Sequence, residues 1–203
     1  MATIGNFKVS GTLSLKIEQE NLNAPFGPWF DGMMRHVPVS VVMAGAGLEA
    51  CANEIMGDIL DGTVGVSIDG SRRTLLNDLK SDRSGNATDR YRRLALLMDH
   101  EPDTSTEVWH NTRLLIRFRN DFMHFKPSWD HDDVHSGDLV SQLKTRIPVV
   151  NAYQGSFLFP FGFMTYGCAK WAVQSLLAFS SQFATLIGVR DKLAMPGLDC
   201  KIP

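Results

Sequence analysis

The sequence predicts a mainly α-helical protein: a bundle of about five helices with a short N-terminal β-strand or hairpin in front of it. Three observations lead to this prediction. The chain has 203 residues, 44% hydrophobic and 21% charged, as in a folded domain with a core. Apolar residues recur three and four positions apart through most of it, which is the period of an amphipathic helix. Stretches rich in glycine, proline and polar residues separate these segments.

The first part of the chain departs from the helical pattern. Its apolar residues alternate with other residues, as in a half-buried strand. They are Phe7, Val9, Leu13, Leu15 and Ile17. A segment rich in proline, glycine and aromatic residues follows at residues 24–30 and predicts a loop. We therefore expect residues 1–36 to form a strand-and-loop appendage and residues 37–203 to form the helical bundle.

The helical bundle is expected to begin near Pro38, because proline is favourable in the first turn of a helix. This first helix reaches Leu60 and contains Gly45 and Gly47. Each glycine lowers the helix propensity by roughly 1 kcal/mol, unless it permits the close approach of another helix. Further helices are expected at residues 71–80, 88–98, 105–125 and 163–186, with a short one at residues 138–145.

Charge and cysteine content restrict the class of protein. The formal net charge is −2 and the isoelectric point is near 6.3, so any surface for nucleic acid is a local patch. The three cysteines, Cys51, Cys168 and Cys200, have no paired or metal-binding spacing, which favours a reducing compartment. No signal peptide is recognisable. The apolar stretch from Phe157 to Val189 holds too many polar residues for a membrane span. We expect a cytoplasmic protein with no membrane contact.

Two other clusters have alternative interpretations. The middle of the chain is locally basic, with Arg72, Arg73, Lys80, Arg83, Arg90, Arg92 and Arg93. These residues form either a solvated helix face, the simpler interpretation, or a groove for a phosphate backbone. The loop at residues 129–138 holds His131, His135 and several aspartates, which are metal-ligand types, but such a stretch is more often a solvated acidic loop. We expect no metal and no cofactor.

Residues 116–127, Ile-Arg-Phe-Arg-Asn-Asp-Phe-Met-His-Phe-Lys-Pro, are the most informative segment. Arg119 is followed directly by Asn120 and, five positions on, by His124. The segment ends a helix, because Pro127 disfavours helical geometry in the residue before it. It resembles the Arg-x4-His motif of the HEPN superfamily. That superfamily contains helical bundles that are metal-independent ribonucleases or inactive scaffolds.

An upstream segment also resembles this family. Glu49 and Asn53 lie one turn apart, as in a HEPN helix that carries a Glu and an Asn. The resemblance implies a supporting role for both at the site. Their alternative role is to hold one helix to another.

The resemblance implies RNA cleavage by Arg119 and His124 between two protomers of a homodimer, with RNA as substrate and an antitoxin as a further protein partner. Histidine transfers protons near neutral pH, and arginine offers a fork of donors to phosphate oxygens. Asn120 is expected to orient His124, four positions away on one helix face. On a regular helix the side chains of Arg119 and His124 point in directions about 140° apart, so the two do not face the same way. Nearby candidates for RNA binding are Arg113, Arg117 and Lys126.

Structural interpretations of the same residues remain open. A histidine in the last turn of a helix interacts favourably with the helix dipole. Arg119 has Glu49 and Asp121 as alternative ion-pair partners. The second functional hypothesis is accordingly a catalytically inactive HEPN-like helical dimer, a scaffold that binds a nucleotide, a nucleic acid or a protein.

Overall fold

The computed structural model describes residues 12–21, 27–82, 85–124, 137–150 and 159–194. Across these residues the protein contains seven α-helices and no strand. The prediction of a mainly α-helical protein is therefore confirmed.

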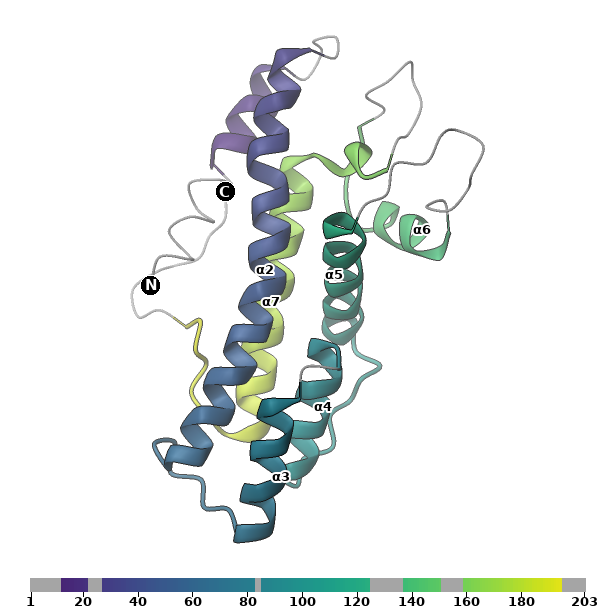
Figure 1. Cartoon of the computed structure of the whole chain (residues 1–203). Helices are drawn as coiled ribbons and strands as arrows, with labels where there is room; N and C mark the ends of the chain where they lie inside the picture. Colours follow the sequence, from purple (N-terminus) through teal and green to yellow (C-terminus); the bar gives the residue numbers. More distant parts are fainter. Residues whose placement is uncertain (1–11, 22–26, 83–84, 125–136, 151–158, 195–203) are drawn as a thin grey trace. The chain divides into compact units, whose positions relative to one another are not determined.

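Figure 1 shows the helices in their order along the chain. After a helix at residues 12–20 come α2 (Pro28–Asp61), α3 (Gly70–Ser81), α4 (Ala87–Leu97), α5 (Glu107–Met123), α6 (Asp138–Lys144), the 3-10 helix η2 (Phe161–Phe163) and α7 (Tyr166–Ile187). Side-chain caps explain where two of them begin, because Asp69 and Asn86 accept hydrogen bonds from the first-turn N–H groups of α3 and α4. The predicted helices agree with α3 to α7 to within about three residues.

The predicted strand at residues 7–17 is wrong where the structure describes it, because residues 12–20 are helical. Phe7 and Val9 lie outside the described residues. Its one buried residue is Ser14, and Leu15, Ile17 and Glu18 are half-buried, whereas Leu13 is exposed. The Glu18 carboxylate accepts a hydrogen bond from the Tyr166 N–H at the start of α7. The face of this helix that lies against the protein therefore mixes polar and apolar residues, so the alternation of apolar residues was misleading.

The predicted start of the helical bundle near Pro38 is also wrong. α2 begins ten residues earlier, at Pro28, and Pro38 lies inside it. The preference of proline for the first helical position is met by Pro28 instead. The expected domain boundary after residue 36 thus falls within a continuous helix.

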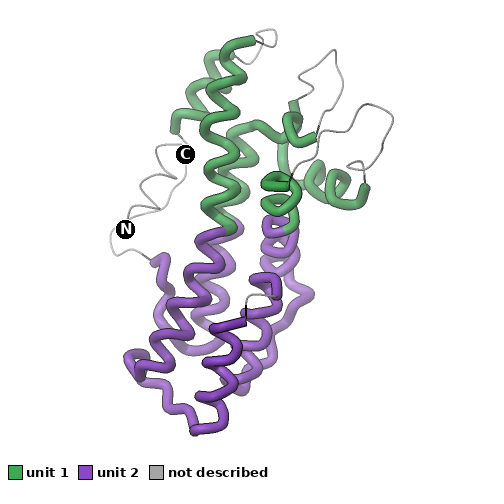
Figure 2. The backbone as a smooth tube through the Cα atoms, viewed as in Figure 1, with its two compact units in different colours: residues 1–45, 117–174, 199–203 green, residues 46–116, 175–198 purple. Residues whose placement is uncertain are grey.

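The chain forms two compact units, each built from separate parts of the sequence (Figure 2). Unit 1 comprises residues 1–45, 117–174 and 199–203, and unit 2 comprises residues 46–116 and 175–198. α2, α5 and α7 each contribute residues to both units.

Aromatic side chains form the core of unit 1. Phe118 of α5 packs edge-on against Phe159 and Phe163, with ring centroids 6.1 and 5.6 Å apart. Pairs of this geometry add about 0.5–1.5 kcal/mol each beyond their buried area. α6 buries Leu139 and Leu143. Phe118 thereby fixes the rotation of the α5 segment that carries the motif.

Unit 2 has its own aromatic core around Tyr91 of α4. The Tyr91 ring lies 4.8 Å from the Phe179 ring and 4.6 Å from the Phe183 ring, both on α7. Its hydroxyl donates a hydrogen bond of 2.8 Å to the Leu48 carbonyl of α2. Burial raises the pKa of Tyr91 well above its ordinary value. Tyr91 therefore ties α4 to both α2 and α7 within this unit.

The segment after α7 is held to α2. Gly188, with a φ of 70°, ends α7 in the left-handed conformation that glycine adopts readily. Four residues on, the Lys192 ammonium binds the carboxylates of Asp58 and Glu54, one turn apart on α2. The hydrogen bond to Asp58 raises the pKa of Lys192. This ion-pair group therefore anchors the segment after α7 to α2.

Two cysteines are buried, one in each unit. Burial, aided by the charge of Glu54, raises the pKa of the Cys51 thiol to about 11. Burial also raises the pKa of the Cys168 thiol. Both side chains are therefore neutral thiols near pH 7.

α2 is the one helix in the described residues that is long and apolar enough to cross a membrane. Half of its apolar 18-residue window is buried inside the protein. Core helices of soluble proteins also meet these criteria. The sequence analysis weighed the stretch at residues 157–189 instead, and the cytoplasmic localisation stays a prediction.

Tyr91→Phe should lower the free energy of unfolding by about 1 kcal/mol, because it deletes the hydrogen bond to Leu48 and keeps the ring packing. Urea denaturation measures the change. Tyr166→Phe is a matched control, since its buried hydroxyl has no hydrogen-bond partner in the described structure. The control should be neutral or stabilising, and an equal loss in both variants would contradict the assignment.

Lys192→Met should destabilise the protein in a pH-dependent way. Because the folded pKa of Lys192 is raised, its stabilising effect is complete below its unfolded pKa, about 10.4, and is lost as the pH rises through the folded value. The difference in urea stability between wild type and variant should therefore shrink above that pH. A difference that stays constant at alkaline pH would rule out the ion pair as its source.

Candidate functional site

The candidate site lies at the C-terminal end of α5. Asn120 is in the last turn of the helix and His124 follows its final residue. The His124 N–H donates a backbone hydrogen bond of 2.9 Å to the Asn120 carbonyl. Both residues are exposed. The expected helix end is thus confirmed, and the two polar residues lie one turn apart on the surface of unit 1.

Arg119 is half-buried beside this exposed pair, and its Nε atom is buried. Its side chain lies against Gly45 of α2, in the same unit. A Cβ atom built on Gly45 would be 2.9 Å from Nε and 3.2 Å from Cγ of Arg119. Gly45 therefore permits a close approach of α5 to α2, as the sequence analysis considered, and the side chain that approaches it is Arg119 of the motif.

The buried face of α5 determines which side chains of the motif reach solvent. Leu115 and Phe118 are fully buried, whereas Arg117 and Asn120 are exposed. Because a helix turns by about 100° per residue, Arg119 lies at the edge of the buried face. This position gives it contact with both α2 and solvent.

Glu49 and Asn53 lie on α2 in unit 2. The Asn53 side-chain oxygen accepts a hydrogen bond of 2.8 Å from Nη2 of Arg90 on α4. Arg90 also donates to the Lys80 carbonyl, at 3.3 Å. Asn53 therefore holds α2 to α4, which supports the structural interpretation of this residue. Glu49 is half-buried.

Two of the candidate RNA-binding residues are described, and both are exposed. Arg117 forms a 3.4 Å ion pair with Asp138 at the start of α6. Exposed pairs of this kind contribute little free energy, so Arg117 remains accessible to another anion. Arg113 lies on the part of α5 that belongs to unit 2. Lys126 lies outside the described residues.

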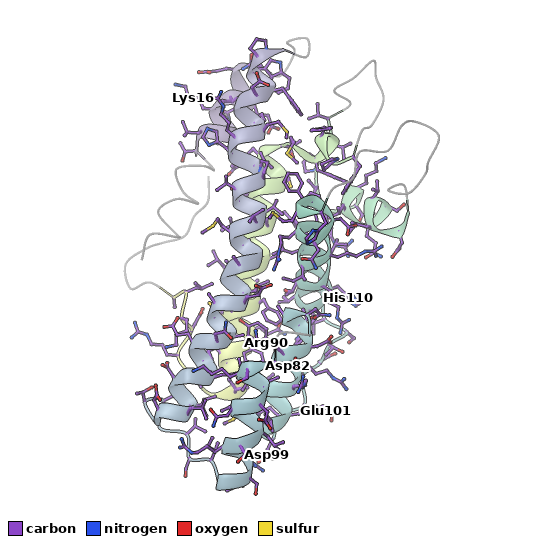
Figure 3. The ribbon with its side chains drawn as sticks, in the orientation of Figure 1. Lys16, Asp82, Arg90, Asp99, Glu101 and His110 are labelled. Carbon is purple, nitrogen blue, oxygen red and sulfur yellow. The ribbon has the colours of Figure 1, made fainter. Side chains whose placement is uncertain are left out.

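The basic cluster of α3 and α4 is largely engaged within unit 2. Arg72 forms a bidentate pair with Asp99, and Arg93 pairs with Asp82. Arg73 donates to the Leu60 carbonyl. Figure 3 labels Asp82 and Asp99, the acidic partners of Arg93 and Arg72. These contacts favour the solvated helix face over a phosphate groove.

Within the described residues, no group of three or more His, Cys, Asp and Glu side chains is placed to hold a metal ion. His131 and His135 lie outside the described residues.

Comparison with known proteins gives no relative: no family model, curated protein or solved structure matches the chain.

The contact between Asn53 and Arg90 should appear as a coupling energy in a double-mutant cycle. We expect Asn53→Ala and Arg90→Ala to be coupled by about 0.5–1.5 kcal/mol in the free energy of unfolding. Urea denaturation of the two single variants and the double variant measures the coupling. Additive losses for Asn53 would contradict its role in holding the helices.

Proposed function

We propose that this protein is a metal-independent endoribonuclease of the HEPN type, a toxin or defence component, that cleaves RNA with Arg119 and His124. The observation that carries the proposal is the exposed pair Asn120 and His124 at the end of α5, with Arg119 beside it. The end of α5 thus carries an acid–base group in His124, an amide in Asn120 and a permanent cation in Arg119. Metal-free RNA cleavage can use an acid–base group for proton transfer and a cation that stabilises the charge on the phosphate.

The proposed reaction uses each residue in a separate role. His124 takes the proton from the RNA 2′-hydroxyl as its oxygen attacks the adjacent phosphorus. The bond between phosphorus and the 5′-oxygen breaks, and that oxygen takes a proton from solvent as it leaves, while the His124 imidazolium returns its proton to solvent. The products are a 2′,3′-cyclic phosphate and a 5′-hydroxyl. Arg119 donates hydrogen bonds to the phosphate oxygens, where negative charge increases in the transition state.

Asn120 serves as the positioning residue for His124 in this proposal. The two residues are four positions apart, so their side chains project from the same face of the helix. The backbone hydrogen bond between them keeps the helical geometry as far as His124. An amide at this position has both a donor and an acceptor for the imidazole ring.

A homodimer is part of the proposal. Arg119 is partly held against Gly45 while His124 faces solvent, so the two side chains leave α5 in different directions. In a homodimer, the end of α5 from a second protomer would reach the same RNA. Arg119 of one protomer and His124 of the other would then act on one phosphate. Arg117 and Arg113 would then contact the RNA backbone, and an antitoxin would bind over the same end of α5.

A non-enzymatic scaffold is the second candidate, and the contact of Arg119 with Gly45 favours it. An arginine packed against a neighbouring helix has a structural use without any reaction. In that case the end of α5 binds a nucleotide, a nucleic acid or a protein, and no RNA is cut.

Cleavage of a mixed RNA pool in EDTA distinguishes the two functions. We expect wild type to cut RNA and leave cyclic-phosphate ends, and His124→Ala and Arg119→Ala to lower the rate by about 10²–10⁴-fold. His110→Ala is the matched control, because His110 is also an exposed histidine of α5. It should keep the wild-type rate. Absence of cutting by folded wild type would favour the scaffold.

A further inference from the structure

The contact between Gly45 and Arg119 assigns a specific role to a glycine in the middle of α2. Gly45 is buried, and all three atoms nearest to the place of its missing Cβ belong to Arg119. The distances from that place are 2.9 Å to Nε, 3.2 Å to Cγ and 3.5 Å to Cβ. The first is shorter than a van der Waals contact, so any side chain at position 45 would displace the arginine.

We infer that Gly45 is a positioning residue, which fixes the Arg119 guanidinium by leaving space for its Nε and Cγ atoms against α2. The inference rests on the proposed function for its catalytic consequence. The two Nη atoms that would bind phosphate oxygens are joined to Nε through one carbon atom. Holding Nε therefore limits where they can reach. A side chain that is held before the substrate binds loses less freedom in the transition state.

A second glycine of α2 provides a matched control. The missing Cβ of Gly47 would lie 3.1 Å from a methyl group of Leu176 on α7, in unit 2. Gly45→Ala and Gly47→Ala thus add the same methyl group to the same helix. They also bring the same gain in helix propensity. Only the first of these methyl groups touches the arginine of the motif.

The position of Arg119 is measurable without any activity. Its buried Nε–H should give a slowly exchanging arginine side-chain signal in a nitrogen–proton NMR spectrum, assigned by its loss in Arg119→Lys. In Gly45→Ala this signal should shift and exchange about tenfold faster or more, because the side chain is displaced toward solvent. In Gly47→Ala it should stay as in wild type. An unchanged signal in Gly45→Ala would overturn the inference.

If Gly45→Ala fails to fold, the double variant Gly45→Ala, Arg119→Ala decides the question. It lacks the Nε and Cγ atoms that the new methyl group would meet. Recovery of the fold in the double variant supports the contact, and continued failure overturns it.

The catalytic consequence is tested by single-turnover RNA cleavage in EDTA. We expect Gly45→Ala to lower the rate constant at saturating RNA by about tenfold or more, with RNA affinity nearly unchanged, and Gly47→Ala to keep the wild-type rate. A displaced Arg119 signal with a wild-type rate would overturn the positioning role. If wild type cuts no RNA, the proposed function fails, whereas the NMR signal still decides whether Gly45 holds Arg119.

Discussion

The close approach of neighbouring side chains to the middle of α2 constrains how α5 packs against this helix in unit 1 and how α7 packs against it in unit 2. Residues 44–47 read Ala-Gly-Ala-Gly. Gly45 makes space for Arg119 in unit 1, and Gly47 makes space for Leu176 in unit 2. Each glycine costs roughly 1 kcal/mol of helix propensity. Apolar residues of α2 on either side of the run, such as Val41 and Leu48, are fully buried and offset this cost.

The fold was predictable where a local signal coincided with the tertiary environment. α3 and α4 begin directly after Asp69 and Asn86, whose side chains cap them, and their apolar residues face the core. The N-terminal helix was missed because its one buried residue is the polar Ser14, while its apolar residues alternate at the spacing of a strand. The start of α2 was misplaced because two prolines, ten residues apart, both fit the preference for a first turn, and only one occupies it.

The site was predictable as a segment but not as an arrangement. The end of α5 and the exposure of His124 follow from the apolar spacing before them and from Pro127 after them. The neighbour of Arg119 is 74 positions away along the chain, and the partner of Asn53 is 37 positions away. Nothing in the local sequence encodes such distant contacts. The supporting role of Asn53 at the candidate site stays a prediction, whereas its alternative role of holding one helix to another agrees with its hydrogen bond to Arg90 of α4.

The two buried thiols give the protein an internal means of reporting local opening. A neutral, buried cysteine reacts with an alkylating reagent only when its surroundings open and the thiolate forms. Cys168 belongs to unit 1 and Cys51 to unit 2. Cys200 lies outside the described residues and would be replaced by serine. The mass of each labelled peptide over time would then measure how often each unit opens locally. The chain thus carries its own probe of whether the two units unfold together or in turn.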